Sequence, residues 1–168
     1  MKTLLLMRHA KSSWKHHDLK DHDRPLNKRG KKDAPLMGKL IHEKELIPQI
    51  ILCSSANRAR LTAEGMLDDI DYKGEIRYLD SLYLAEVPAY IEEINNLPDE
   101  MERVLVIGHN PALESLLQIL CSQVESLPTA ALAYLSLPIQ HWNELSDKTE
   151  GELVELLKPR ELKVKSKK

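Results

Sequence analysis

Apolar runs of strand length recur along the chain. They lie at residues 4–7, 49–54, 103–107 and 131–137. Unbroken runs of this kind are typical of strands that are covered on both faces of a sheet. A further, shorter strand is predicted at residues 75–79. Residues 152–157 fit either a strand or a helix, and their late position after Gly151 favours a strand.

The segments between these runs carry apolar residues at helical spacing. One helix is expected over residues 27–44, with Asn27 as its N-cap and an irregularity near Pro35. A second follows the strand at 49–54 and continues to about Leu67. Two more are predicted, at residues 88–96 and directly after Pro111.

Strands that alternate with helices predict an α/β fold. We expect a three-layer α/β/α sandwich with a mostly parallel central sheet. A length of 168 residues is most simply one domain, residues 1–168. Its last six residues, 163–168, form a basic end of low apolar content, which we expect to be a disordered tail.

Composition excludes some classes of function. The net charge of −2 argues against nucleic-acid binding through bulk charge. No segment has the length of a membrane span, so no membrane partner is expected. Cys53 and Cys121 lie far apart in apolar runs, which predicts two buried free thiols and a cytoplasmic location. The sequence indicates no oligomeric state.

Cationic and imidazole side chains follow three of the predicted strands. Arg8 and His9 follow the first, Arg58 follows the second, and His109 follows the strand at 103–107. In a parallel sheet these strand ends share one edge, where ligands of α/β proteins bind. Two guanidiniums and two imidazoles repel each other unless an anion lies between them, and no matching carboxylates are evident. Guanidinium groups bind tetrahedral oxyanions bidentately, so a phosphoryl group is the expected ligand.

The polar segment from Lys11 to Arg24 contains three histidines, His16, His17 and His22, beside several aspartates. This composition is compatible with metal binding, but no ligand pair has a recognisable spacing, and a solvated loop is the preferred interpretation. The chain also lacks the phosphate-binding loops of nucleotide enzymes. We therefore predict phosphoryl chemistry with no metal or other cofactor.

Four segments, taken together, resemble a known family. Residues 6–12 are similar to the Arg-His-Gly/Ala signature of the histidine phosphatase (phosphoglycerate-mutase-like) superfamily. Residues 23–30 resemble the Arg-Pro-Leu-Thr-x-x-Gly element of its small SixA-like phosphohistidine phosphatase branch. Residues 54–64 resemble the Ser-x-x-x-Arg-Ala-x-x-Thr-Ala block, and residues 106–111 resemble the second histidine element.

The resemblance implies a role for each matching residue. His9 matches the nucleophile that takes the phosphoryl group, and His109 matches the histidine that helps to hold it. Arg8 and Arg58 match the arginines that bind its oxygens, and Arg24 lies at a position that lines the pocket. The implied reaction has two steps, namely formation of phospho-His9 and its hydrolysis by water.

The general acid of larger family members has no clean match here. Asp80 and Glu86 are the candidates, and each is equally compatible with a solvated loop. The lack of a clearly matched general acid suits a phosphoramidate better than an alkyl ester, because a ring nitrogen is easily protonated and leaves readily. This favours phosphohistidine on a signalling protein as the phosphorylated substrate. The alternatives are a phosphatase of small phosphoesters, a non-catalytic phosphate-binding module and, least favoured because the chain is short, a mutase.

Overall fold

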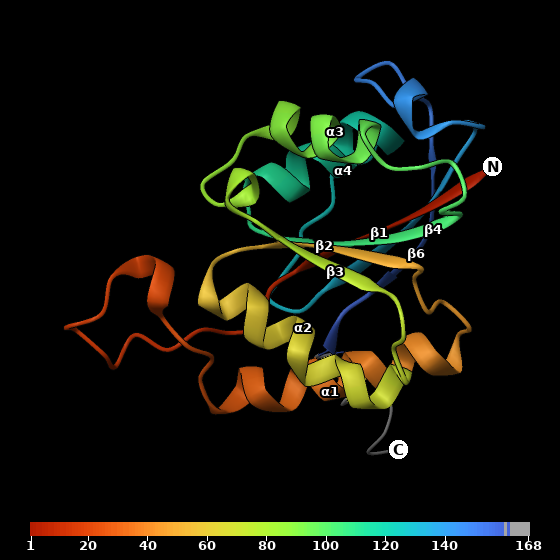
Figure 1. The fold of residues 1–168 in the computed structure, drawn as a ribbon. Coiled ribbons are helices and arrows are strands. Elements are labelled where there is room, and N and C mark those ends of the chain that lie inside the picture. Colours follow the sequence, from red (N-terminus) through yellow and green to blue (C-terminus); the bar gives the residue numbers. More distant parts are fainter. Residues whose placement is uncertain (160, 162–168) are drawn as a thin grey trace.

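Six strands form one mixed sheet in the computed structural model, which describes residues 1–159 and 161 (Figure 1). The strands are β1 (Lys2–Arg8), β2 (Ile50–Ser54), β3 (Glu75–Leu79), β4 (Arg103–Gly108), β5 (Leu132–Leu137) and β6 (Glu152–Leu157). Their order across the sheet is β3-β2-β4-β1-β5-β6. The predicted basic tail at 163–168 lies outside the described residues.

The first four strands of this order run parallel, and β5 reverses the direction. β1 pairs in parallel with β4 and antiparallel with β5, which in turn pairs antiparallel with β6. The prediction of a mostly parallel sheet is thus confirmed. Residues 152–157, whose sequence fits either a strand or a helix, form a strand. Because β1, β2 and β4 run parallel, their carboxyl ends meet at one edge.

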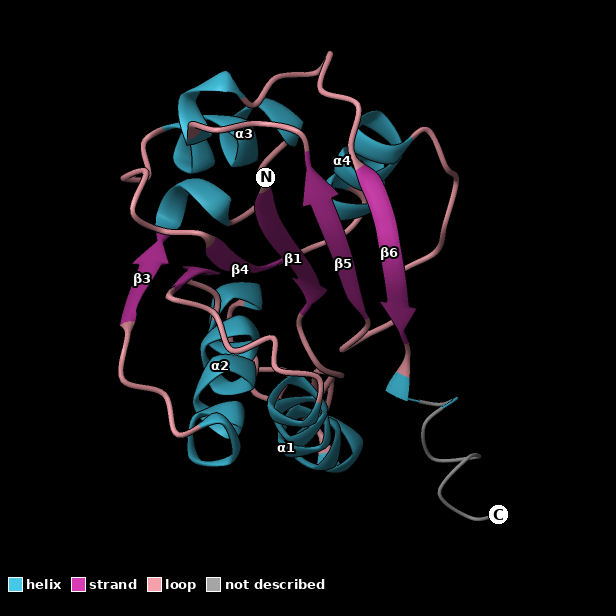
Figure 2. Cartoon of the chain, turned by 90° about the vertical axis from the view of Figure 1, so that its right-hand side faces the viewer, coloured by secondary structure: helices cyan, strands magenta, loops and turns pink. Residues whose placement is uncertain are grey.

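Four helices cover the two faces of the sheet (Figure 2). α1 (Lys28–Glu43) and α2 (Asn57–Ile70) lie on one face, and α3 (Val87–Asn95) and α4 (Ala112–Cys121) lie on the other. Alternate residues of β1 serve the two cores, because successive side chains of a strand point to opposite faces. Leu4 and Leu6 join one cluster of buried residues, whereas Leu5 and Met7 join the other. The three-layer fold is confirmed.

α1 begins where the sequence indicates. The Asn27 side chain accepts a hydrogen bond from the Gly30 N–H at 2.9 Å, which caps the helix. The irregularity expected near Pro35 is absent, since α1 runs unbroken past it. We attribute this to tight packing against α2, where Gly65 leaves room for the α1 side chains at 34 and 35. α2 extends to Ile70, three residues beyond the predicted end, and stops at a left-handed residue, Asp71.

Both cysteines are buried and free, as predicted. Among the described residues, no helix combines the length and the apolar character that crossing a membrane requires.

Gly108 ends β4 directly before His109, and its α-carbon lies against the ring of Tyr90. A β-carbon at position 108 would overlap the Tyr90 hydroxyl. We therefore expect Gly108→Ala to lower the free energy of unfolding by about 1–3 kcal/mol, as overpacking of a core does. Urea unfolding measures this loss. Tyr90→Phe removes the overlapping oxygen, so the same glycine substitution should be less costly in that background. An equal loss in both backgrounds would contradict the predicted contact.

Candidate active site

The carboxyl edge of the sheet carries a cavity of about 520 Å³. It is lined by all five residues singled out in the sequence, namely Arg8, His9, Arg24, Arg58 and His109. The ends of β1 and β4 are also joined directly, because the His9 N–H donates to the Gly108 carbonyl at 3.1 Å. The topology therefore brings together side chains that are far apart in the sequence.

His9 is buried, with 7% of its surface exposed, and its ring is fixed by the backbone of the next residue. Nδ1 lies 2.7 Å from the Ala10 carbonyl oxygen. A carbonyl oxygen only accepts, so Nδ1 carries the proton and Nε2 keeps the lone pair in the neutral ring. The Ala10 N–H in turn donates to Thr62 Oγ1 at 2.9 Å, which ties this turn to α2. The other ring nitrogen of His9, Nε2, thereby keeps a free lone pair.

The surroundings of His9 keep it neutral. Burial is the main cause, and repulsion from His109, Arg58 and Arg8 adds to it, so that the pKa of His9 falls to about 3. Burial also lowers the pKa of His109 to about 4, again with repulsion from Arg58. Both imidazoles are therefore uncharged near neutral pH, while the neighbouring guanidiniums keep their charge.

His109 faces His9 and is held by β2. The two ring centroids are 5.1 Å apart, and His109 Nε2 lies 2.7 Å from Ser54 Oγ. Ser54 Oγ also accepts a hydrogen bond from the Ala56 N–H at 3.2 Å. The hydroxyl proton of Ser54 is thus available to donate to His109 Nε2. In that arrangement Nε2 accepts, and the proton of the neutral His109 ring is on Nδ1.

Asp21 is the residue beside the candidate site that sequence reasoning did not single out as a partner of these cations. Its carboxylate accepts hydrogen bonds from Arg58 Nη2 at 3.2 Å, from Arg24 Nε at 3.1 Å and from the Tyr83 hydroxyl at 2.6 Å. Its backbone oxygen binds Arg58 Nη1 at 2.9 Å. The expectation that no carboxylate matches these cations was therefore wrong.

The pKa of Asp21 falls to about 2, mainly because it accepts the Tyr83 hydrogen bond, with further contributions from Arg58 and Arg24. Asp21 is therefore ionised throughout the physiological pH range. A single carboxylate fixes two cations of the cavity, although it lies in the loop that the sequence favoured as solvated.

Arg24 and Arg8 complete the cationic lining. Arg24 is 7% exposed, and its Nη1 donates to Ser12 Oγ at 2.7 Å. Arg8 Nη1 donates to the Leu127 carbonyl at 3.3 Å, and its buried Nε has no hydrogen-bond partner among the described residues. Burial lowers the pKa of Arg8, while nearby Glu114 acts in the opposite direction. An anion in the cavity would supply Arg8 with the acceptor that it lacks.

The two candidate acids are placed differently. Glu86 lines the cavity just before α3, whereas Asp80 begins a short turn and is absent from the cavity lining. In the histidine-rich loop, His22 does not line the cavity, and its Nε2 lies 2.9 Å from Ser55 Oγ. In the described part of the chain, no three His, Cys, Asp or Glu side chains are grouped as metal ligands.

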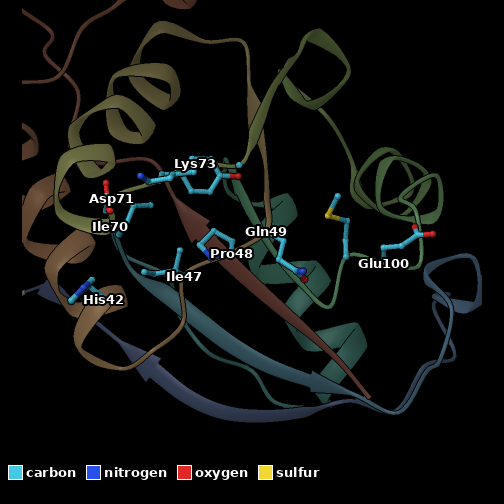
Figure 3. Close-up of a pocket in the computed structure, with 11 residues that line it drawn as sticks. His42, Ile47, Pro48, Gln49, Ile70, Asp71, Lys73 and Glu100 are labelled. Carbon is cyan, nitrogen blue, oxygen red and sulfur yellow. The ribbon is translucent and has the colours of Figure 1, made fainter.

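A larger cavity, of about 680 Å³, lies near the start of β2, at the opposite edge of the sheet (Figure 3). Its charged side chains do not converge. Asp71 and Glu100 lie on opposite sides of it, and His42 lies apart from both. It contains none of the predicted site residues.

The cavity places guanidiniums beside a neutral histidine, an arrangement suited to a tetrahedral anion. Comparison with known proteins identifies the family. The model of the histidine phosphatase superfamily (branch 1) matches residues 4–83. An uncharacterized protein of Mycobacterium tuberculosis is 35% identical over 150 residues, which cover 83% of this chain and 91% of the relative. An uncharacterized chloroplastic protein of Arabidopsis thaliana is 32% identical over 151 residues, covering 84% and 69%.

Solved structures show the same fold. A proposed phosphohistidine phosphatase SixA from Nakamurella multipartitia superposes with a TM-score of 0.82 at 25% identity, covering 94% of this chain and 96% of the other. A proposed SixA from Agrobacterium tumefaciens gives 0.81 at 27% identity, covering 94% and 98%. The chain belongs to the histidine phosphatase superfamily, in its SixA-like branch. It is accordingly a phosphatase.

Asp21→Asn keeps the size of the side chain but removes the charge that holds Arg58 and Arg24. We expect kcat/KM to fall about tenfold, because a hydrogen bond to a charged group is worth about 1.5–3 kcal/mol. The matched control is Asp23→Asn in the same loop. The Asp23 carboxylate lies 3.6 Å from His22 Nδ1 and forms no ion pair with an arginine among the described residues. Steady-state kinetics on an aryl phosphate compares the two. If Asp21→Asn is as active as the wild type, the carboxylate only reduces the charge of the cavity and does not position its cations.

Proposed function

We propose that this phosphatase hydrolyses phosphohistidine on a protein through a covalent phospho-His9 intermediate. The observation that carries the proposal is the orientation of His9, whose Nδ1 proton is held by the Ala10 carbonyl. This hydrogen bond fixes the tautomer, and burial keeps the ring neutral. A lone pair on Nε2 is then available without prior removal of a proton.

In the first step, Nε2 of His9 forms a bond to phosphorus as the bond from phosphorus to the substrate's imidazole nitrogen breaks. The departing imidazole takes a proton, and Glu86, which lines the cavity, is the candidate donor. In the second step, water attacks phosphorus and passes a proton to the Glu86 carboxylate, the bond from Nε2 to phosphorus breaks, and inorganic phosphate leaves. The lone pair returns to Nε2, and Glu86 is protonated again for the next cycle. Both steps conserve the charge of the site.

The fixed cations act on the phosphoryl oxygens. Arg8, Arg24 and Arg58 line the same cavity as His9, and two of them are already fixed by Asp21. Preorganised donors of this kind stabilise the charge of a transferring phosphoryl group without reorganisation during the reaction. His109 lies against His9 and supplies a further donor.

A phosphoramidate is the favoured substrate because Glu86 is the one carboxylate among the residues that line the cavity, so few groups there can act as a general acid. The ring of a phosphohistidine is easily protonated before its bond to phosphorus breaks, so it leaves as a neutral imidazole, whereas an alkyl ester must expel a strongly basic alkoxide unless an acid protonates it. The SixA-like proteins at 25% and 27% identity are themselves described as proposed phosphohistidine phosphatases, which supports this choice. A screen of phosphohistidine peptides against phosphosugars tests it directly, and preference for a phosphosugar would contradict it.

His9→Ala should abolish turnover, whereas His109→Ala should leave a measurable part of it. His9 forms a bond in the proposed mechanism, while loss of one charge-stabilising donor costs about 10²–10³-fold. Single-turnover reactions quenched without acid, followed by mass spectrometry, should show a phosphoryl group on His9. A phosphoryl group on His109 would reverse the assignment, and equal small losses in both variants would mean that water attacks the substrate directly.

Chelators should leave activity unchanged, because every group proposed to act belongs to the chain itself. The measurement is the turnover of a phosphohistidine peptide after dialysis against a chelator, with metal content checked by mass spectrometry. Activity that is lost on dialysis and restored by a single divalent metal would contradict the mechanism. His16, His17 and His22 would then be the candidate metal ligands.

A further inference from the structure

Two large apolar side chains stand exposed at the mouth of the active-site cavity. Trp14 is 66% exposed and Leu84 is 79% exposed, and both line the cavity that contains His9. They come from different segments, the loop after β1 and the turn before α3, which lie at the same end of the sheet (Figure 1). We call this pair the apolar rim.

Trp14 rests on a fixed base. The guanidinium carbon of Arg24 lies 3.5 Å from the centre of the Trp14 ring. Arg24 is itself buried and hydrogen-bonded to Ser12 and to the Ser13 carbonyl. A cation stacked on one face of the indole holds the ring in place and leaves its other side open to a ligand. Trp14 is therefore a positioned platform.

The backbone of Leu84 adopts an energetically unfavourable conformation. Its φ of 55° lies in the left-handed region, which is rarely adopted by residues other than glycine, asparagine and aspartate. An exposed leucine in such a conformation contributes neither local stability nor core packing. Strained backbone of this kind concentrates at functional sites. The adjacent Ala85 and Glu86 also line the cavity, so the turn as a whole faces the reaction site.

We infer that the apolar rim binds the polypeptide on either side of the phosphorylated side chain of the substrate. The inference rests on the proposed function, because it places the phosphoryl group among the cations at the floor. A small phosphate compound would fit within about 520 Å³ and leave most of the exposed rim in water. A ligand that also covers the solvent-exposed parts of Trp14 and Leu84 has to extend beyond the phosphoryl group.

Charge and shape together favour a protein segment with apolar residues beside the phosphorylated one. The cations would bind the phosphoryl group, and the rim supplies apolar contacts from two separate segments of the chain. Exposed apolar groups next to a charged pocket are a common sign of a recognition surface. Covering them would remove apolar surface from water, which strengthens binding in proportion to the area covered.

The test compares two phosphohistidine peptides of equal length, one flanked by Leu and Val and the other by Ser and Gly, with free phosphohistidine as the reference. We expect wild-type enzyme to have the higher kcat/KM for the apolar-flanked peptide. In Leu84→Ser and in Trp14→Ala, kcat/KM for the apolar-flanked peptide should fall about five- to tenfold more than kcat/KM for free phosphohistidine. A loss of this size is expected when one partly covered apolar contact is removed.

The matched control is Val124→Ser, which changes an 82% exposed apolar residue that lines a different surface depression. It should leave the peptide preference unchanged. Trp14→Ala also removes the stacking partner of Arg24, so the inhibition constant for tungstate is measured in each variant to monitor the phosphoryl-binding floor. Leu84→Ser has no such contact and gives the cleaner comparison.

Equal kcat/KM for the two peptides in wild-type enzyme would overturn the inference and leave the proposed function intact. Phosphoserine peptides with the same flanks separate the two claims. If they are hydrolysed with the apolar preference while phosphohistidine is not hydrolysed, the rim is supported and the proposed substrate is wrong. Self-association in sedimentation experiments that is lost in Leu84→Ser would assign the rim to a second copy of the chain and would also overturn the inference.

Discussion

The central constraint on this structure is the placement of several cations around a buried imidazole that must stay neutral. Arg8, Arg58 and His109 all disfavour a charge on His9, and burial disfavours it further. This arrangement gives a nucleophile with a free lone pair, but it also concentrates positive charge. Asp21 offsets part of that charge by binding Arg58 and Arg24, and a phosphoryl group offsets more when it binds.

The fold provides this arrangement through its strand order. β1 and β4 are neighbours, so Arg8, His9 and His109 leave the sheet side by side, and β2 adds Arg58 through the start of α2. Close packing then fixes the details. Thr62 of α2 holds the turn after His9, and Ser54 at the end of β2 holds His109. The two histidines of the candidate site are thus positioned by residues of α2 and β2.

These roles explain which parts of the site could be predicted. Arg8, His9 and His109 directly follow strands with a clear apolar signal, so their shared edge follows from the α/β pattern alone. Asp21 could not be placed in the same way, because it lies in a polar loop rich in Lys, His and Asp, where one carboxylate resembles another. Its contact with Arg58 spans 37 positions of the sequence. The only local signal was its spacing of three residues from Arg24. Pro35 is the opposite case: local propensity predicted an irregularity, but α1 continues past it, with residues 34 and 35 beside Gly65 of α2.

The protonation state of His9 tests this account most directly. Selective ¹⁵N labelling of histidine, with His9→Gln to assign the signal, reports by NMR which ring nitrogen carries the proton. The folded pKa of about 3 lies below the unfolded value of about 6.5, so His9 should stay neutral, with its proton on Nδ1, from pH 7.5 down to about 5. A His9 ring that becomes protonated near pH 6.5, or that carries its proton on Nε2, would contradict the account.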